Sequence, residues 1–265
     1  MNTLKYYVWC MLFFYCTASQ TLQINLTPAQ KKEIAERIWF NEASGHYDKL
    51  VFWNQNENFP SLGICHFIWF PENCKEQYTQ TFPELLQYFK KNLVHMPAWL
   101  QNAHYAPWST RAEFLKPEHQ QQIEELKALM YSTMHVQVDF IIDRFERMWP
   151  DIQKQALASE QQKITANYTL LMQSPQGIFA LLDYLNFKGA GIDPKERYNN
   201  VAWGLLQVLQ TMETTHKEDA VAQFVQAAKA VLTNRVSHAP VDKAHEKQWL
   251  PGFFNRLDRY QTALS

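Results

Sequence analysis

The sequence predicts an α+β fold that is mostly α-helical and carries a small antiparallel β-sheet. The chain has only 7 glycines in 265 residues. Its long stretches rich in Gln, Glu, Ala, Lys and Leu favour helices, and runs of β-branched residues, which favour strands, are few. With 46% hydrophobic and 14% aromatic residues, the composition is that of a globular protein with a well-filled core and not that of a disordered chain.

The first residues are typical of a secretory signal peptide. Lys5 precedes an apolar run, residues 6–16, and small residues follow at 17–19. The run is shorter than the roughly 20 apolar residues that a membrane-spanning helix needs, so an uncleaved anchor is the less favoured alternative. We therefore expect cleavage near Ser19 or Gln20, which removes residues 1–19. The remaining chain, residues 20–265, is expected to be periplasmic or secreted, to have no integral membrane span and to form a single domain.

The net charge excludes some classes of partner. The formal net charge is −1 for the whole chain, and loss of the lysine in the signal peptide makes it about −2. A chain so close to neutral has no electrostatic reason to bind nucleic acid or an anionic membrane surface. The sequence contains no indication of the oligomeric state.

No metal or cofactor is expected. Asp139 and Asp143 are four residues apart and would share one face of a helix, but the charged residues around them are typical of a solvated face. The histidines in this part of the chain lack a ligand spacing such as H-E-x-x-H. They are His95, His104, His119 and His135.

A helix is predicted to begin just after Thr27. Thr27 is a suitable N-cap residue, a proline follows at the first helical position, and Gln30 is a capping-box partner. Ile34 and Ile38 continue at helical spacing, so the apolar face turns inward and Glu42 arrives at the end of the helix near the core. An ordinary helix-terminal carboxylate is the alternative interpretation of Glu42.

A small antiparallel sheet is predicted directly after this helix. Between His46 and Pro71 the chain alternates apolar and polar residues over short runs. The residues expected at its turns are Gly45, Asn54, Asn56 and Pro60. Glu42 therefore stands where helix gives way to sheet, a position from which a carboxylate can reach into a cleft.

The rest of the chain is predicted to be helical. Residues 82–169 form a series of helical segments broken by prolines, and residues 118–149 carry apolar side chains at helical spacing. Residues 177–188 predict a strongly apolar helix, and Gly189 and Gly191 predict its stop and a turn. A further helix is expected over residues 198–212.

The segment Ser61-Leu62-Gly63-Ile64-Cys65-His66 resembles the T-x-G-I-G-H signature of phage-type lysozymes and endolysins. That family cleaves the glycan strands of peptidoglycan and has a glutamate shortly before the hairpin, where this chain has Glu42. Ser61 stands in place of the family's threonine and Cys65 in place of a glycine, whereas Gly63, Ile64 and His66 match.

Two later stretches resemble the same family, in the same order along the chain. The residues from Asn186 to Gly189 read N-F-K-G, a permuted version of the family's F-N-x-G stretch. The segment from Trp249 to Leu257 is similar to a closing L-P-G-L-x-x-R-R segment, and Arg256 matches its first arginine.

The resemblance implies a lysozyme-like helical domain, with the small sheet at the active site and a helical insertion over about residues 82–169. The implied activity is glycoside hydrolysis of peptidoglycan glycan strands by a muramidase, with Glu42 as general acid. Ser61 is expected to orient a water. Glu57 is the expected second carboxylate, with Asp48 as its competitor.

Two other functions stay open. If no second carboxylate is near, Glu42 alone serves a lytic transglycosylase, in which a muramyl hydroxyl replaces water. A catalytically inactive lysozyme-like glycan-binding or interaction protein is the rival class. The near-neutral charge, Cys65 in place of glycine and the loose alignment around Glu57 favour it.

The remaining predicted site residues are expected to contact the substrate or to stabilise the structure around the site. Trp53 and Asn54 are the expected substrate contacts, because an aromatic ring covers the apolar face of a sugar. His66 and Arg256 are expected to support the hairpin and to dock the last helix. Cys65 and Cys74 are expected to form a disulfide once the two cysteines of the signal peptide are lost, with two reduced thiols as the alternative.

Overall fold

The structure is a computed structural model that describes residues 23–75, 79–213 and 216–264. The predicted signal peptide, residues 1–19, lies outside the described residues. The fold is mostly helical, as predicted, with one antiparallel sheet of 3 strands and another of 2 strands. Within the described ranges, no helix has both the length and the apolar character to cross a membrane.

The first helix, α1 (Pro28–Ala43), begins as the sequence predicts. The Thr27 hydroxyl accepts a hydrogen bond from the backbone N–H of Gln30 at 3.2 Å, and the Gln30 side chain accepts one from the Thr27 N–H at 3.0 Å. This capping box satisfies two donors that a helix start leaves without partners. The helix ends at Ser44, which is left-handed with φ 53°, so Glu42 lies in its last turn.

The predicted small sheet follows α1. Its strands are β1 (Val51–Phe52), β2 (Ser61–Leu62) and β3 (Phe67–Ile68), and they pair antiparallel in the order β1-β2-β3. Ser61, in the central strand, is opposite Phe52 on one side and Ile68 on the other. The strand β3 is therefore an edge of this sheet.

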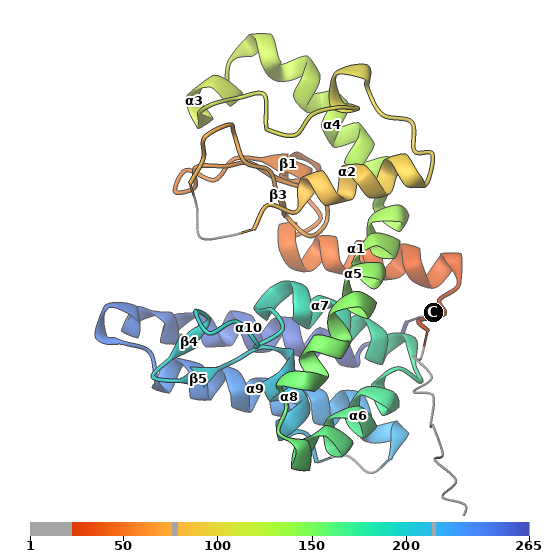
Figure 1. Cartoon of the computed structure of the whole chain (residues 1–265), viewed down its shortest axis with the longest axis vertical. Coiled ribbons are helices and arrows are strands. Elements are labelled where there is room, and N and C mark those ends of the chain that lie inside the picture. The colour runs from red at the N-terminus through yellow and green to blue at the C-terminus, as the bar shows by residue number, and fades with distance from the viewer. Residues whose placement is uncertain (1–22, 76–78, 214–215, 265) are drawn as a thin grey trace, which may run out of the picture.

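The helices form two lobes (Figure 1), and one hydrophobic cluster of buried residues extends through both. The upper lobe holds the three-stranded sheet, and α1 and α5 pass between the lobes. The upper helices and the long connecting helix are α2 (Phe82–Lys91), α3 (Arg111–Phe114), α4 (Gln120–Ser132) and α5 (Met134–Gln155).

The lower lobe contains the second sheet and the remaining helices. These elements are α6 (Ala158–Leu171), α7 (Pro175–Lys188), β4 (Arg197–Tyr198), β5 (Val201–Ala202), α8 (Leu205–Thr211), α9 (Ala220–Ser237) and α10 (Leu250–Asp258). Short 3₁₀ helices cover Tyr47–Leu50, Ala98–Leu100, Pro117–His119, Lys217–Asp219, Val241–Trp249 and Arg259–Gln261.

Two predicted helix boundaries are wrong. The helix expected over residues 198–212 begins only at Leu205, because the β4–β5 hairpin takes the residues before it. The turn residues Asn199 and Asn200 have φ values of 48° and 65°, and two successive left-handed residues, often asparagine, make a tight hairpin turn. Pro150 does not break a helix either, since α5 continues through it to Gln155.

A candidate active-site groove between the lobes

A groove with a volume of 610 Å³ lies between the small sheet and the lower lobe. The segment from Cys65 to Ile68 forms one wall with Thr79 and Thr81, and the end of α7 and the loop after it form the other. Side chains of α5 line it between these walls. The lining residues from α5 and the second wall are Ile141, Arg144, Met148, Asp151, Leu185, Asn186, Gly189, Ala190, Gly191, Ile192, Asp193 and Glu196.

The Glu42 carboxylate lies where the two walls meet. Its Oε1 accepts hydrogen bonds from Asn186 Nδ2 at 3.0 Å and from Arg256 Nη2 at 2.5 Å. Its Oε2 lies 3.5 Å from His66 Nδ1. His66 and Asn186 line the groove from opposite walls, and the Glu42 side chain is 15% exposed. Glu42 is therefore a mostly buried acid that lies behind two lining residues of the groove, His66 and Asn186.

Arg256 is shared between two carboxylates. Its Nε and Nη2 donate to Asp183 Oδ2 and Oδ1 at 2.8 and 2.9 Å, and Tyr260 donates its hydroxyl to Asp183 Oδ2 at 2.5 Å. Asp183 is fully buried. Burial alone lowers the pKa of Arg256, but Asp183 and Glu42 outweigh burial and raise that pKa well above its usual value.

Arg256 is shared unequally between the carboxylates of Asp183 and Glu42. One guanidinium faces two carboxylates, and Asp183 takes its bidentate contact, the stronger geometry for such a pair. Glu42 receives a single hydrogen bond from Arg256, at Oε1. The other oxygen of Glu42, Oε2, faces His66.

His66, the residue expected to support the hairpin, lies in its turn and contacts Glu42. It has a left-handed φ of 52° in the turn between β2 and β3, and its ring packs edge-on against Phe52 with centroids 4.9 Å apart. Burial lowers the pKa of His66 even though the Glu42 charge acts in the opposite direction. The imidazole is therefore neutral at pH 7 and does not compete with Arg256 for the Glu42 carboxylate.

The structure does not bring Ser61 or Glu57 into the groove. Ser61 is in the central strand and only 5% exposed, one strand behind the residues of β3 that line the groove. Glu57 is in the loop between β1 and β2, where its backbone carbonyl accepts a hydrogen bond from Trp53 Nε1 at 2.8 Å. Neither residue is in the lining of the groove, so the structure does not bring the predicted water-orienting serine and second carboxylate together in it.

Trp53 and Asn54 lie at a different surface. The Trp53 side chain is buried, and its ring packs against Phe114 with centroids 5.9 Å apart. Both residues line a separate depression of 440 Å³, together with Arg111 and Lys127. Trp53 is buried because α3 packs over the β1–β2 loop, so it serves as core and does not contact a substrate in the groove.

No disulfide joins Cys65 to Cys74. Cys65 is a free, buried thiol in the turn between β2 and β3, and burial raises the pKa of this thiol well above its usual value. The Cys74 sulfur lies 3.7 Å from the carbonyl oxygen of Asn58, just before β2. Asn58 precedes β2 and Cys65 follows it, so the two sulfurs lie beyond opposite ends of this strand.

Several residues of the groove were not predicted from the sequence. Asp183 is the one acid within the apolar stretch GIFALLDYLNFK, and a lone carboxylate in an apolar helix is a signal that a buried partner exists. Asp48, the competitor for second carboxylate, pairs with Lys127 at 3.0 Å outside the groove. The carboxylates of Asp193 and Glu196, in the loop after α7, belong to no sequence motif that would have identified them.

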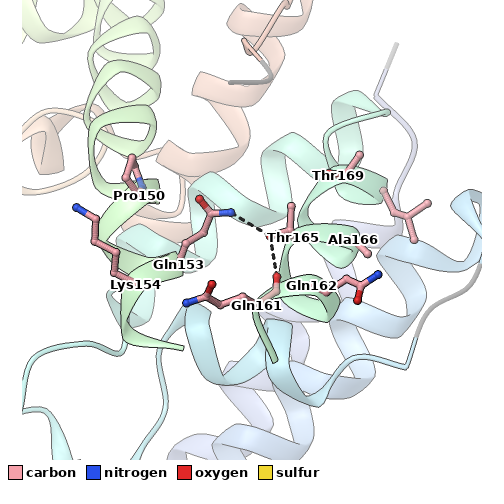
Figure 2. A pocket seen from close by; sticks show the side chains of 9 residues that line it. Pro150, Gln153, Lys154, Gln161, Gln162, Thr165, Ala166 and Thr169 are labelled. Atoms are coloured by element: carbon pink, nitrogen blue, oxygen red, sulfur yellow. Dashed lines mark hydrogen bonds between the residues drawn. The ribbon is translucent and has the colours of Figure 1, made fainter. Parts of the chain in front are cut away.

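Another cavity, of 880 Å³, lies between α5 and α6. Its lining includes the amides of Gln153, Gln161 and Gln162 and the hydroxyls of Thr165 and Thr169 (Figure 2), and Gln153 Nε2 donates to Thr165 Oγ1 at 2.9 Å. Its lining contains Lys154 but no carboxylate or histidine. Of these two cavities, the groove is the one whose lining carries carboxylates and a histidine. Among the described residues, no group of three or more His, Cys, Asp or Glu side chains is placed to hold a metal ion.

Comparisons of the chain with protein-family models, with curated proteins and with solved structures found no match.

Proposed function

We propose that the protein is a secreted or periplasmic hydrolase of peptidoglycan glycan strands, a muramidase that uses Glu42 as general acid. The observation that carries this proposal is the position of the Glu42 carboxylate, which is 15% exposed and contacts His66 and Asn186, two lining residues from opposite walls of the groove. An acid held in this way can protonate a glycosidic oxygen in the bound strand.

The lining of the groove suits a sugar. Its volume of 610 Å³ lies within the range typical of ligand sites, about 300–1,000 Å³. Apolar side chains such as Met148 and Ile192 lie beside the hydrogen-bonding groups of Thr79 and Asn186. This mixture matches a pyranose, which has apolar C–H faces and hydroxyl edges.

The proposed acid step begins with a proton on Glu42 Oε2, the oxygen that faces neutral His66. This proton moves to the oxygen that links N-acetylmuramic acid to N-acetylglucosamine, and the bond from that oxygen to C1 breaks. Arg256 and Asn186 then stabilise the Glu42 carboxylate through Oε1. In a hydrolase water completes the reaction, whereas in a lytic transglycosylase the muramyl 6-hydroxyl attacks and leaves an anhydro end.

The second candidate function is binding of glycan strands without cleavage. The contact of 2.5 Å between Arg256 and Glu42 favours it, because a guanidinium stabilises the ionised form of an acid that must carry a proton to act. In that case, the groove holds the strand and Glu42 serves only the structural cluster with Asp183.

Replacement of Glu42 by Gln tests the proposal. Gln retains the side-chain shape but cannot deliver a proton, so we expect release of soluble fragments from purified sacculi to fall by about 100-fold or more. Glu118→Gln, at a side chain that is 66% exposed, is the control and should keep the wild-type rate. Binding of sacculi by the wild-type protein without any release of fragments would support the second candidate instead.

A further inference from the structure

We propose that Glu196 is the second carboxylate of the groove and acts as its general base; the proposal rests on the proposed glycan-hydrolase function. The described carboxylates in the lining of the groove are Asp151, Asp193 and Glu196, and none of them is on the small sheet. A second catalytic carboxylate in the groove would therefore come from α5 or from the loop after α7.

Two of these three acids have other partners. Asp151 pairs with Lys154 one helical turn along α5, at 3.6 Å, and its side chain is 65% exposed. Asp193 accepts a hydrogen bond from the Lys195 backbone N–H at 2.8 Å and so holds the turn of its own loop. For the Glu196 carboxylate, the described part of the chain provides no ion pair and no hydrogen bond.

The carboxylate of Glu196 lies over Gly189, directly after α7. A Cβ atom on Gly189 would be 2.9 Å from Glu196 Oε2. Gly189 has φ 75° and ψ −177°, a conformation that is essentially limited to glycine. Its N–H bonds to the Leu185 carbonyl at 2.9 Å and its carbonyl accepts from the Leu205 N–H at 3.0 Å, so the backbone under Glu196 is held at both ends.

The same turn of α7 also meets Glu42. Asn186, which donates to Glu42 at 3.0 Å, precedes Gly189 by three residues, or about 4.5 Å along a helix axis. Glu42 thus approaches this turn at Asn186 and Glu196 approaches it at Gly189, both at the wall of one groove. The two carboxylates therefore meet residues that are one helical turn apart, at the end of α7.

Electrostatics agree with the role of a base. Burial and the Asp193 charge raise the pKa of Glu196. A carboxylate with a raised pKa is a stronger base once it is ionised, and a base works best when its pKa is near the working pH.

The reaction is balanced as an inverting hydrolysis. Glu42 gives its proton to the glycosidic oxygen, and the bond from this oxygen to C1 breaks. The water oxygen bonds to C1 from the opposite face and gives one proton to Glu196. Glu42 ends as carboxylate and Glu196 as acid, and exchange of one proton with solvent restores both. The new reducing end has the inverted anomeric configuration.

The first test compares Glu196→Gln, Glu42→Gln and Glu118→Gln on purified sacculi. We expect Glu196→Gln to lower kcat by about 100-fold or more and Glu118→Gln to leave it unchanged. An inactive Glu42→Gln with a fully active Glu196→Gln would overturn the role of Glu196 alone. No release of fragments by the wild-type protein would overturn the proposed function and this inference together.

Two further readouts separate a base from a structural residue. Asp193→Asn keeps an acceptor for the Lys195 N–H but removes a charge that raises the pKa of Glu196, so the acidic limb of the kcat–pH profile should move to lower pH. In Glu196→Ala, added azide should restore turnover by attacking C1 itself, with Glu42 still protonating the leaving oxygen. An unmoved limb, retained anomeric configuration, anhydro products or no azide rescue would contradict the assignment.

Discussion

Arg256 Nη2 and Glu42 Oε1 lie 2.5 Å apart, although 214 residues separate them in the chain. The contact joins α10 to the last turn of α1. Since Arg256 also holds the buried Asp183 of α7, three helices meet at one guanidinium. The site and the packing of the lower lobe therefore depend on the same side chain.

Replacement of Arg256 by Ala should destabilise the protein strongly. It leaves the fully buried Asp183 with no cation, and loss of one partner of a buried pair costs about 3–5 kcal/mol. We expect the free energy of unfolding in urea to fall by this amount. Arg259→Ala is the control: Arg259 is exposed, although it donates to Asn41 at 3.0 Å, and its loss should cost about 1 kcal/mol or less. Equal losses would show that the Asp183 contact contributes nothing.

The stability of the protein should depend on pH through His66. Because burial lowers the pKa of His66 in the folded state, the unfolded chain takes up a proton first as the pH falls below about 6.5. The free energy of unfolding should therefore fall from pH 7 toward pH 5, whereas above about pH 7 His66 contributes no pH dependence.

The variant His66→Asn measures this contribution. Asn tolerates the left-handed φ of 52° and does not titrate, so urea unfolding of the variant should show a weaker loss of stability between about pH 7 and 5. His104→Asn, at an exposed position, is the control. If the wild-type protein and His66→Asn have parallel profiles, the buried imidazole does not contribute.

Two glycines should respond in opposite ways to Ala. Gly63 has φ 71°, and a Cβ there would lie 2.4 Å from Oε1 of the fully buried Gln137, which accepts from the Ile64 N–H at 2.9 Å. Gly63→Ala should therefore lower the free energy of unfolding by about 1–3 kcal/mol. Gly252 has no atom within 4 Å of its added Cβ, so Gly252→Ala should be neutral or stabilising by up to about 1 kcal/mol. The opposite order would contradict the packing of the β2–β3 turn.

Cys65 should react as a free thiol only after unfolding. In the native protein it is buried and its pKa is raised, so iodoacetamide at pH 7 should leave it unmodified. After unfolding in urea without a reductant, the peptide that contains Cys65 should carry the label, as mass spectrometry can show. A peptide that becomes labelled only after treatment with dithiothreitol would mean that Cys65 is in a disulfide.

Local signals were enough to predict the first elements of the fold. The Thr27 and Gln30 capping box and the alternating pattern after residue 46 concern neighbours in sequence, and the structure confirms α1 and the small sheet. The β4–β5 hairpin was missed because the apolar pattern of the following helix extends back over it. Its signal is the pair Asn199-Asn200, which has left-handed φ at both residues.

The candidate site was only partly predictable. The position of Glu42 follows from the helix that carries it, and the supporting roles of His66 and Arg256 followed from motif resemblance. The partner of Arg256, Asp183, is 73 residues away, and Asn186 meets Glu42 across 144 residues. Periodicity in one element gives no information about such contacts. The residues of the second wall of the groove could therefore be identified only from the three-dimensional structure.

The joining of α1 to α10 also limits the order in which a nascent chain can mature. When Glu42 is added to the growing chain, its partner Arg256 is still 214 residues from synthesis. Closing so long a loop costs entropy that local contacts do not repay. A chain whose synthesis stops before α10 therefore has the acid without its counterion.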